Sequence, residues 1–138
     1  MTSREDWIVV YPGNDAGEQF IESLIRERLP FAAAAVNEGQ RARLARSGVP
    51  CLSEAVDAAL PRSRIPELPI GRVYLFEDGL PACCRLIRLF RSWTGRPIYV
   101  ITQGSNFRAI YREIGADYVI HTNGSDVSFL IPHENHIG

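Results

Sequence analysis

The stretch IVVYPGNDAGEQF, residues 8–20, decides the fold of this chain. Its first four residues are a continuous apolar run, which is typical of a buried parallel strand. A proline and a glycine end that run, and a helical pattern begins directly afterwards. In open α/β sheets this turn often has the pattern G-x-G-x-x-G, whereas here, aligned on Gly17, residues 12–17 are PGNDAG. The stretch predicts a strand–turn–helix unit and raises the question of what the altered turn does.

The same alternation of strand and helix continues along the chain. Strands are predicted at 7–11, 31–36, 49–52, 72–77, 97–102 and 117–122, and helices at 15–28, 40–46, 54–60, 81–93 and 106–115. Strands that alternate with helices indicate right-handed βαβ units and a parallel sheet. The predicted fold is therefore α/β: a Rossmann-like doubly wound parallel sheet of about six strands in the order 3-2-1-4-5-6, with helices on both faces.

Length and composition limit the class of protein. The 138 residues suit a single domain, 1–138, with a short C-terminal tail at 123–138. Hydrophobic residues make up 46% and charged residues 22%, as in soluble globular proteins, and the net charge of −1 gives no general attraction to nucleic acid. No apolar run reaches the ~20 residues of a membrane span, and the charged N-terminus lacks a signal-peptide core. We therefore expect a cytoplasmic protein without nucleic-acid binding or direct membrane insertion.

Two interpretations of the altered turn remain open. Pro12 lacks an N–H donor, and Asn14 brings a side chain to a position where glycine would let the backbone approach a pyrophosphate. Under one interpretation, Asn14 or Asp15 caps the helix and the pocket has lost its nucleotide. Under the other, Gly13 supplies part of the turn's flexibility, Gly17 keeps the close helix–strand packing, and the helix N-terminus still binds an anion.

Polar residues also follow two other predicted strands. Asn37 and Glu38 come after the second strand, and Glu38 lies about 20 positions beyond Gly17, the spacing of a ribose-binding acid. Glu77 and Asp78 follow the fourth strand, at the carboxyl edge where open α/β sheets bind ligands. Each pair has a second interpretation as a solvated turn, with Asp78 near a helix start.

Three segments together resemble a known family. They are YREIGADYVIHT (111–122), with its Gly-Ala-Asp triplet before the last strand, RVYLFEDGLPACCRLIRLF (72–90) and RLARSGVPCLSEA (43–55). They are similar to the corresponding segments of the N-terminal RCK domain, also called TrkA-N or KTN, a Rossmann-type domain that regulates potassium channels and transporters. The resemblance covers roughly residues 7–122.

The resemblance implies a ligand and some of the residues that hold it. In that family the first turn holds the phosphates of a nucleotide, and an acid after the second strand binds a ribose hydroxyl. Carried over, the three glycines of the turn fall at residues 12, 14 and 17, and the acid falls at residue 37 or 38. The implied cofactor is NAD(H) or an adenine nucleotide. Together with the residues after the fourth strand, the candidate binding site comprises Gly13, Asn14, Asp15, Gly17, Asn37, Glu38, Glu77 and Asp78.

The cysteines and histidines indicate no metal site. Cys83 and Cys84 are adjacent in a predicted helix, so their side chains point about 100° apart, which suits neither a structural disulfide nor zinc. We interpret them as small buried residues. His133 and His136 lie near the C-terminus, where a short tail rarely holds ligands together.

These observations favour a regulatory, non-enzymatic module that binds a nucleotide or another small ligand. The resemblance implies a potassium channel or transporter as its partner, acting in trans. The apolar segment 126–131 could form a homodimer surface or fold back onto its own sheet. The alternative is a Rossmann scaffold that has lost nucleotide binding and acts as a dimerisation or protein-interaction module. A small NAD-dependent oxidoreductase is disfavoured, because no catalytic set is evident and the chain contains no lysine.

Overall fold

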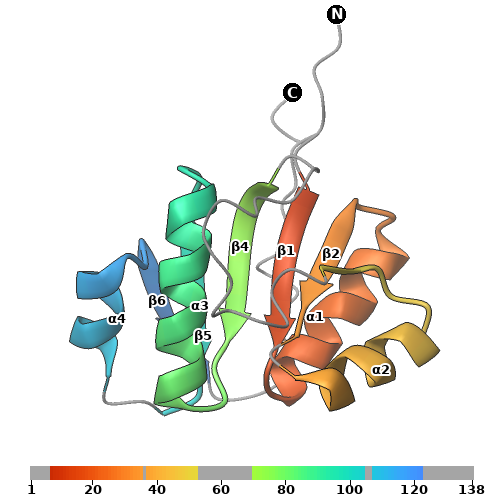
Figure 1. Ribbon diagram of the computed structural model, residues 1–138, viewed down its shortest axis with the longest axis horizontal. Coiled ribbons are helices and arrows are strands. Elements are labelled where there is room, and N and C mark those ends of the chain that lie inside the picture. Colours follow the sequence, from red (N-terminus) through yellow and green to blue (C-terminus); the bar gives the residue numbers. More distant parts are fainter. Residues whose placement is uncertain (1–6, 36, 53–69, 105–106, 123–138) are drawn as a thin grey trace, which may run out of the picture.

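The computed structural model describes residues 7–35, 37–52, 70–104 and 107–122 (Figure 1). Its elements are β1 (Trp7–Pro12), α1 (Asp15–Arg26), β2 (Phe31–Ala34), α2 (Glu38–Arg46), β3 (Cys51–Leu52), β4 (Ile70–Phe76), α3 (Leu80–Trp93), β5 (Ile98–Thr102), α4 (Arg108–Ile114) and β6 (Tyr118–His121). The strands form one sheet in the order β3-β2-β1-β4-β5-β6. The predicted Rossmann-like α/β fold is confirmed.

The direction of winding changes between β1 and β4. β1 pairs with β2 on one side, where Val9 lies opposite Ala32, and with β4 on the other, where Tyr11 lies opposite Leu75. All the strand pairs are parallel, so the carboxyl ends of the strands share one edge, at the bottom of Figure 1. Open α/β sheets bind their ligands outside the carboxyl ends at such a switch point. This edge is therefore where a functional site is expected.

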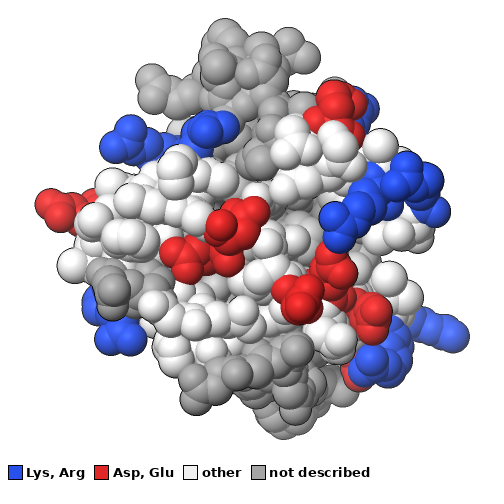
Figure 2. Space-filling model, turned by 90° about the horizontal axis from the view of Figure 1, so that it is seen from below, with Lys and Arg blue, Asp and Glu red and all other residues white. Residues whose placement is uncertain are grey.

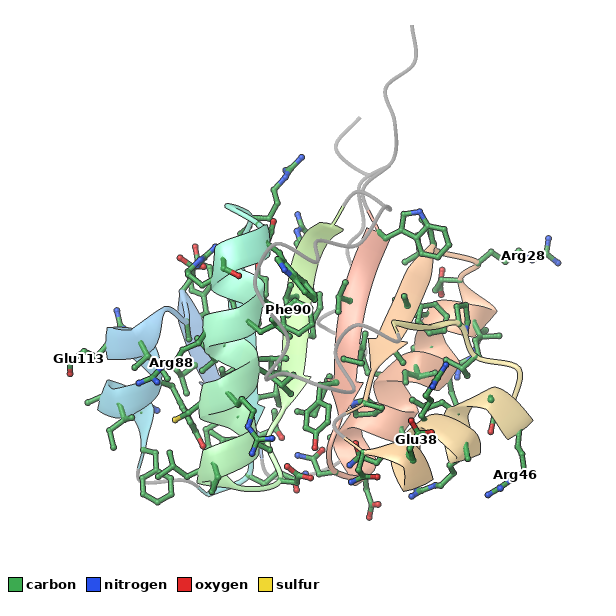
Figure 3. All side chains as sticks on the ribbon, viewed as in Figure 1. Arg28, Glu38, Arg46, Arg88, Phe90 and Glu113 are labelled. Atoms are coloured by element: carbon green, nitrogen blue, oxygen red, sulfur yellow. The ribbon has the colours of Figure 1, made fainter. Side chains whose placement is uncertain are left out.

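Helices cover both faces of the sheet and form two apolar layers. On one face, Phe20 of α1 packs in a buried cluster with Val10 of β1. On the other, Leu86 and Phe90 of α3 pack in a cluster with Val9, and Figure 3 shows Phe90 directed from α3 toward the sheet. A fully buried side chain of this kind stabilises the fold by roughly 1.5–3 kcal/mol. The two layers therefore give the loops at the carboxyl edge a rigid support.

The boundaries of several elements differ from the predicted ones. α1 ends at Arg26 rather than at residue 28, because Arg28 has φ 59°, a left-handed conformation in which a helix does not continue. α2 begins at Glu38, before the predicted start at residue 40, because Asn37 caps it with its side chain. The helical turns predicted at 54–60 lie outside the described residues.

The Gly-Ala-Asp triplet before β6 has a structural role. The guanidinium group of Arg91, on α3, donates to the Asp117 carboxylate at 2.9 Å and to the Gly115 carbonyl oxygen at 2.8 Å. Gly115 has φ 138°, a backbone conformation that favours glycine, and a Cβ there would lie only 3.1 Å from Arg91 Cδ. The Asp117 carboxylate also accepts a hydrogen bond from Ile98 N–H at 2.8 Å. These contacts join the end of α3 to the starts of β5 and β6.

Candidate functional site

The turn after β1 is closed by the side chain of Asn14. Its Oδ1 accepts a hydrogen bond from Gly17 N–H at 3.1 Å, and its Nδ2 donates to the main-chain carbonyl oxygen of Glu77 at 2.8 Å. Asn14 has an extended backbone, with φ −143°, and is the N-cap of α1. One side chain therefore caps the helix and also ties the turn to the chain that leaves β4.

Gly13 and Gly17 are packed too closely for a side chain. Gly13 N–H contacts the carbonyl oxygens of Tyr11 and Phe76 at 3.0 and 3.1 Å. A Cβ on Gly13 would lie 2.3 Å from the Phe76 carbonyl oxygen, and a Cβ on Gly17 would lie 2.6 Å from Pro12 Cα. Gly17 thus allows the close helix–strand approach that the third glycine of the usual motif allows. Contact of either glycine with a ligand stays a prediction.

Asn37 and Glu38 lie where a ribose-binding acid was expected, and both have other contacts. Asn37 Oδ1 accepts a hydrogen bond from Gln40 N–H at 2.8 Å and so caps α2. The Glu38 carboxylate is exposed and lies 3.4 Å from Arg41 Nη1. A solvated ion pair of this kind contributes little, so a ligand could displace it at low cost. Ribose binding by these two residues stays a prediction.

Asp78 belongs to a chain of hydrogen bonds that crosses the switch point. The Tyr11 hydroxyl, at the end of β1, donates to Asp78 Oδ2 at 2.9 Å. Gln40 of α2 in turn donates from Nε2 to the Tyr11 oxygen at 3.3 Å. Burial, together with the neighbouring Asp78 carboxylate, raises the pKa of Tyr11 to about 12, although the Gln40 bond opposes that shift. The phenol therefore stays protonated at neutral pH and serves as a hydrogen-bond donor.

Glu77 organises the other side of the switch point. Its carboxylate accepts hydrogen bonds from Thr102 Oγ1 at 2.6 Å and from the hydroxyl of Tyr111 on α4. Burial, followed by the bond to Glu77, raises the pKa of Tyr111. Burial, followed by the neighbouring Glu77 carboxylate, also raises the pKa of the Cys83 thiol to about 12. Glu77 thus joins the end of β4 to β5 and α4 through donors that remain protonated at neutral pH.

A cavity of about 390 Å³ opens beside the turn, between α1 and α2. It is lined by residues 12–15 and by side chains of both helices, including Glu22 and Gln40. Glu18 of α1 and Arg43 of α2 form an ion pair across it at 2.6 Å. Figure 2 looks onto the carboxyl edge and shows acidic side chains in the middle of this face, with basic side chains toward its periphery. The volume is that of a site for a small molecule.

The structure brings together most of the candidate residues. Gly13, Asn14 and Asp15 line the cavity. Glu77 meets the turn through Asn14, and Asp78 meets it through Tyr11. Asn37 and Glu38 begin α2 but are not among the described residues that line the cavity.

Sequence reasoning missed several residues of this edge, among them Tyr11, Gln40 and Arg43. Tyr11 ends an apolar run and was interpreted only as a strand residue. Its place directly before the glycine turn was the available signal, because the last residue of a parallel strand reaches the carboxyl edge. Gln40 and Arg43 lie on a short polar helix whose sequence does not indicate which face meets α1.

The described part of the chain contains neither a metal-binding cluster nor a membrane-spanning helix. No three His, Cys, Asp or Glu side chains among residues 7–35, 37–52, 70–104 and 107–122 are grouped so that they could hold a metal ion. No helix in these ranges is long and apolar enough to cross a membrane. Cys83 is buried and Cys84 half-buried, both as free thiols. His133 and His136 lie outside the described residues.

Comparison with known proteins finds solved structures that share this fold. No protein-family model and no curated protein matches the chain. The GsuK channel bound to NAD aligns with a TM-score of 0.67 at 16% identity, over 87% of this chain and 22% of that one. The TrkA-N domain of the inner membrane protein YbaL from Escherichia coli aligns with a TM-score of 0.61 at 14% identity, over 87% of this chain and 90% of that one. The NAD(P)-binding domain of an exopolyphosphatase-related protein from Archaeoglobus fulgidus aligns with a TM-score of 0.65 at 18% identity, over 86% of this chain and 89% of that one.

These alignments establish the kind of fold. The resemblance to TrkA-N and RCK N-terminal domains, inferred from three sequence segments, is confirmed at the level of the fold. The chain spans about a fifth of the length of the GsuK channel chain and most of the length of the other two domains.

Proposed function

We propose that this chain is a regulatory domain, without catalytic activity of its own, that binds a nucleotide or another small ligand at the carboxyl edge of its sheet. The observation that carries the proposal is the cavity of about 390 Å³, which begins at residues 12–15 beside the switch point between β1 and β4. Small-molecule sites measure about 300–1,000 Å³ and favour such switch points.

The solved structures with this fold support a nucleotide, or a compound built like one, as the ligand. One of them is a channel bound to NAD, and another is described as an NAD(P)-binding domain. In this chain the residues that line the cavity, among them Asn14, Asp15 and Gln40, are the groups that would contact such a ligand. Glu38, Glu77 and Asp78 stay candidates from the sequence, because they are not among the residues that line it.

The hydrogen bonds at this edge give a ligand a way to act on a partner. Glu77 contacts Asn14 through its carbonyl oxygen and Tyr111 of α4 through its carboxylate. A ligand that moves the turn would therefore act on α4, where the N-cap residue Phe107 and Ile110 are 37% and 44% exposed. Grouped exposed apolar side chains favour contact with another protein. The partners that we expect are a second copy of this chain and a membrane potassium channel or transporter, which the chain would contact from the cytoplasm.

Thermal unfolding with a panel of ligands tests the proposal. The panel contains NAD, NADH, ATP, ADP, AMP and cyclic dinucleotides, each at several concentrations. A ligand at 100 times its dissociation constant stabilises the fold by about 2.7 kcal/mol, which raises the Tm of a domain of this size by several degrees. Absence of a shift with every compound, in a chain that dimerises in solution, would favour the interaction module instead. Turnover of a nicotinamide cofactor would contradict the non-enzymatic assignment.

A matched pair of variants locates the site. Leu44→Trp fills the cavity from α2, whereas Ala42→Trp adds the same side chain to an exposed position of that helix outside the cavity. The Tm shift should be lost in Leu44→Trp and kept in Ala42→Trp. Loss in both variants, or in neither, would mean that the ligand binds elsewhere.

A further inference from the structure

We infer that the ligand of the cavity between α1 and α2 carries no phosphate and is a nucleoside, a flat aromatic base joined to a hydroxylated sugar. This inference rests on the proposed function, because it concerns the class of ligand that the same cavity takes. Three features of the cavity lead to it: the amides of Gly13 and Gly17 are already bonded, carboxylates exceed cations in the lining, and the floor is apolar.

Two amide donors of the turn, those of Gly13 and Gly17, are already bonded within the protein. Gly13 N–H contacts the carbonyl oxygens of Tyr11 and Phe76, and Gly17 N–H is bonded to Asn14 Oδ1 at 3.1 Å. The Asn14 side chain fills the turn and uses its own amide on the Glu77 carbonyl oxygen. A phosphate group could use these donors only by breaking the bonds that they already make.

The charges that line the cavity disfavour an anion. Its charged residues are Asp15, Glu18, Glu22 and Arg43, so three carboxylates accompany one guanidinium group. Arg43 already pairs with Glu18 at 2.6 Å. An anion that paired with Arg43 would leave the Glu18 carboxylate unpaired beside it. It would also lie near the Asp15 carboxylate at the start of α1. Like charges placed together in this way weaken binding strongly.

The same lining suits an uncharged ligand with hydroxyl groups. Ile21, Val49 and Ala34 line the cavity with only 6%, 8% and 1% of their surface exposed, so they form an apolar floor on which a ring can pack. Carboxylates accept hydrogen bonds only, so sugar hydroxyls are suitable partners for Asp15 and Glu22. A nucleoside combines these two requirements and lacks the phosphate that the carboxylates would repel.

Isothermal titration calorimetry on the full chain tests the inference. Adenosine, guanosine, cytidine and uridine are titrated beside their 5′-monophosphates and NAD. We expect at least one nucleoside to bind about tenfold more tightly than its monophosphate, because the added phosphate meets the carboxylates. Tighter binding of a monophosphate or of NAD would overturn this inference and leave the proposed function standing. Absence of binding by every compound would overturn this inference, and the proposed function would then be decided by the wider ligand panel in thermal unfolding.

A double variant with uncharged side chains of the same shape tests whether the carboxylates cause this preference. Asp15→Asn with Glu22→Gln removes two carboxylates and leaves the Glu18–Arg43 pair in place. The preference for nucleoside over monophosphate should fall at least about fivefold. Glu113→Gln, on α4 and on the opposite side of the molecule from α2 (Figure 3), should keep the preference. An unchanged preference in the double variant would overturn the charge argument.

Discussion

Asn14 and Glu77 are 63 positions apart in the sequence and are joined by a hydrogen bond of 2.8 Å, from the side-chain amide of Asn14 to the main-chain carbonyl oxygen of Glu77. The same Asn14 side chain caps α1 through Gly17 N–H. The altered turn therefore has a structural explanation that needs no ligand: Asn14 fixes the first helix to the fourth strand at the point where the sheet changes its direction of winding.

Asn14→Ala should lower the free energy of unfolding by about 2–3 kcal/mol. Loss of an N-cap costs about 1 kcal/mol, and the half-buried carbonyl oxygen that loses its donor adds about 1–2 kcal/mol. Asn37→Ala is the matched control, because Asn37 caps α2 at an exposed position and should cost only about 1 kcal/mol. Urea unfolding monitored by circular dichroism measures both. Equal losses in the two variants would mean that the bond to Glu77 adds nothing.

Gly17→Ala should destabilise the fold by about 1–3 kcal/mol, because the new methyl group would lie 2.6 Å from Pro12 Cα and 2.9 Å from Phe76 Cβ. The control is Gly39→Ala in α2, where the nearest atom is Asn37 Oδ1 at 3.3 Å. That exposed substitution should change stability by no more than about 0.5 kcal/mol. Thermal unfolding of the two variants compares them directly. A Tm for Gly17→Ala equal to that of the unmodified chain would mean that the turn can widen.

The fold could be predicted from the sequence, whereas the site could be predicted only in part. Apolar runs such as residues 8–11 identify buried strands because the pattern is local. The role of Asn14 as a helix cap could also be predicted, as one of two interpretations, because an N-cap residue is recognised from the few residues around it. Its bond to Glu77 depends on the register of β1 against β4, in which Pro12 lies opposite Phe76, and no local pattern contains that register. Arg91 likewise has the pattern of a surface arginine, although four carbonyl or carboxylate oxygens accept its hydrogen bonds.

Cys83 should not react with thiol reagents in the folded protein, although Cys84 beside it should react slowly. Burial raises the pKa of the Cys83 thiol to about 12, so almost no thiolate is present at pH 8, and the thiolate is the reactive form. Cys84 is half-buried. Labelling with iodoacetamide at pH 8, with and without urea, followed by peptide mass spectrometry, distinguishes the two residues. Modification of Cys83 within minutes in the native protein would contradict its burial.

Asp117→Asn should destabilise the chain at neutral pH, with an effect that fades in acid. Burial opposes ionisation of this carboxyl group, but the hydrogen bond from Ile98 N–H and the Arg91 guanidinium lower the pKa of Asp117 below its usual value. A carboxyl group whose pKa is lower in the folded state stabilises the fold above its unfolded pKa of about 3.9, and that stabilisation is lost as the pH falls through the folded value. The difference in free energy of unfolding between the two chains should therefore be constant above about pH 5 and shrink below about pH 4.

Urea unfolding at several pH values between 7 and the acid limit of the native state measures this difference. Glu113→Gln removes one exposed carboxylate from α4 and controls for the change in net charge. Its effect should stay small over the same range. The difference in free energy of unfolding between Asp117→Asn and the unmodified chain could instead stay the same below pH 4 as at neutral pH. That result would mean that the residue acts through its shape and hydrogen bonds. In that case the charge pairing with Arg91, which joins α3 to β6, would not be what stabilises the Gly-Ala-Asp triplet.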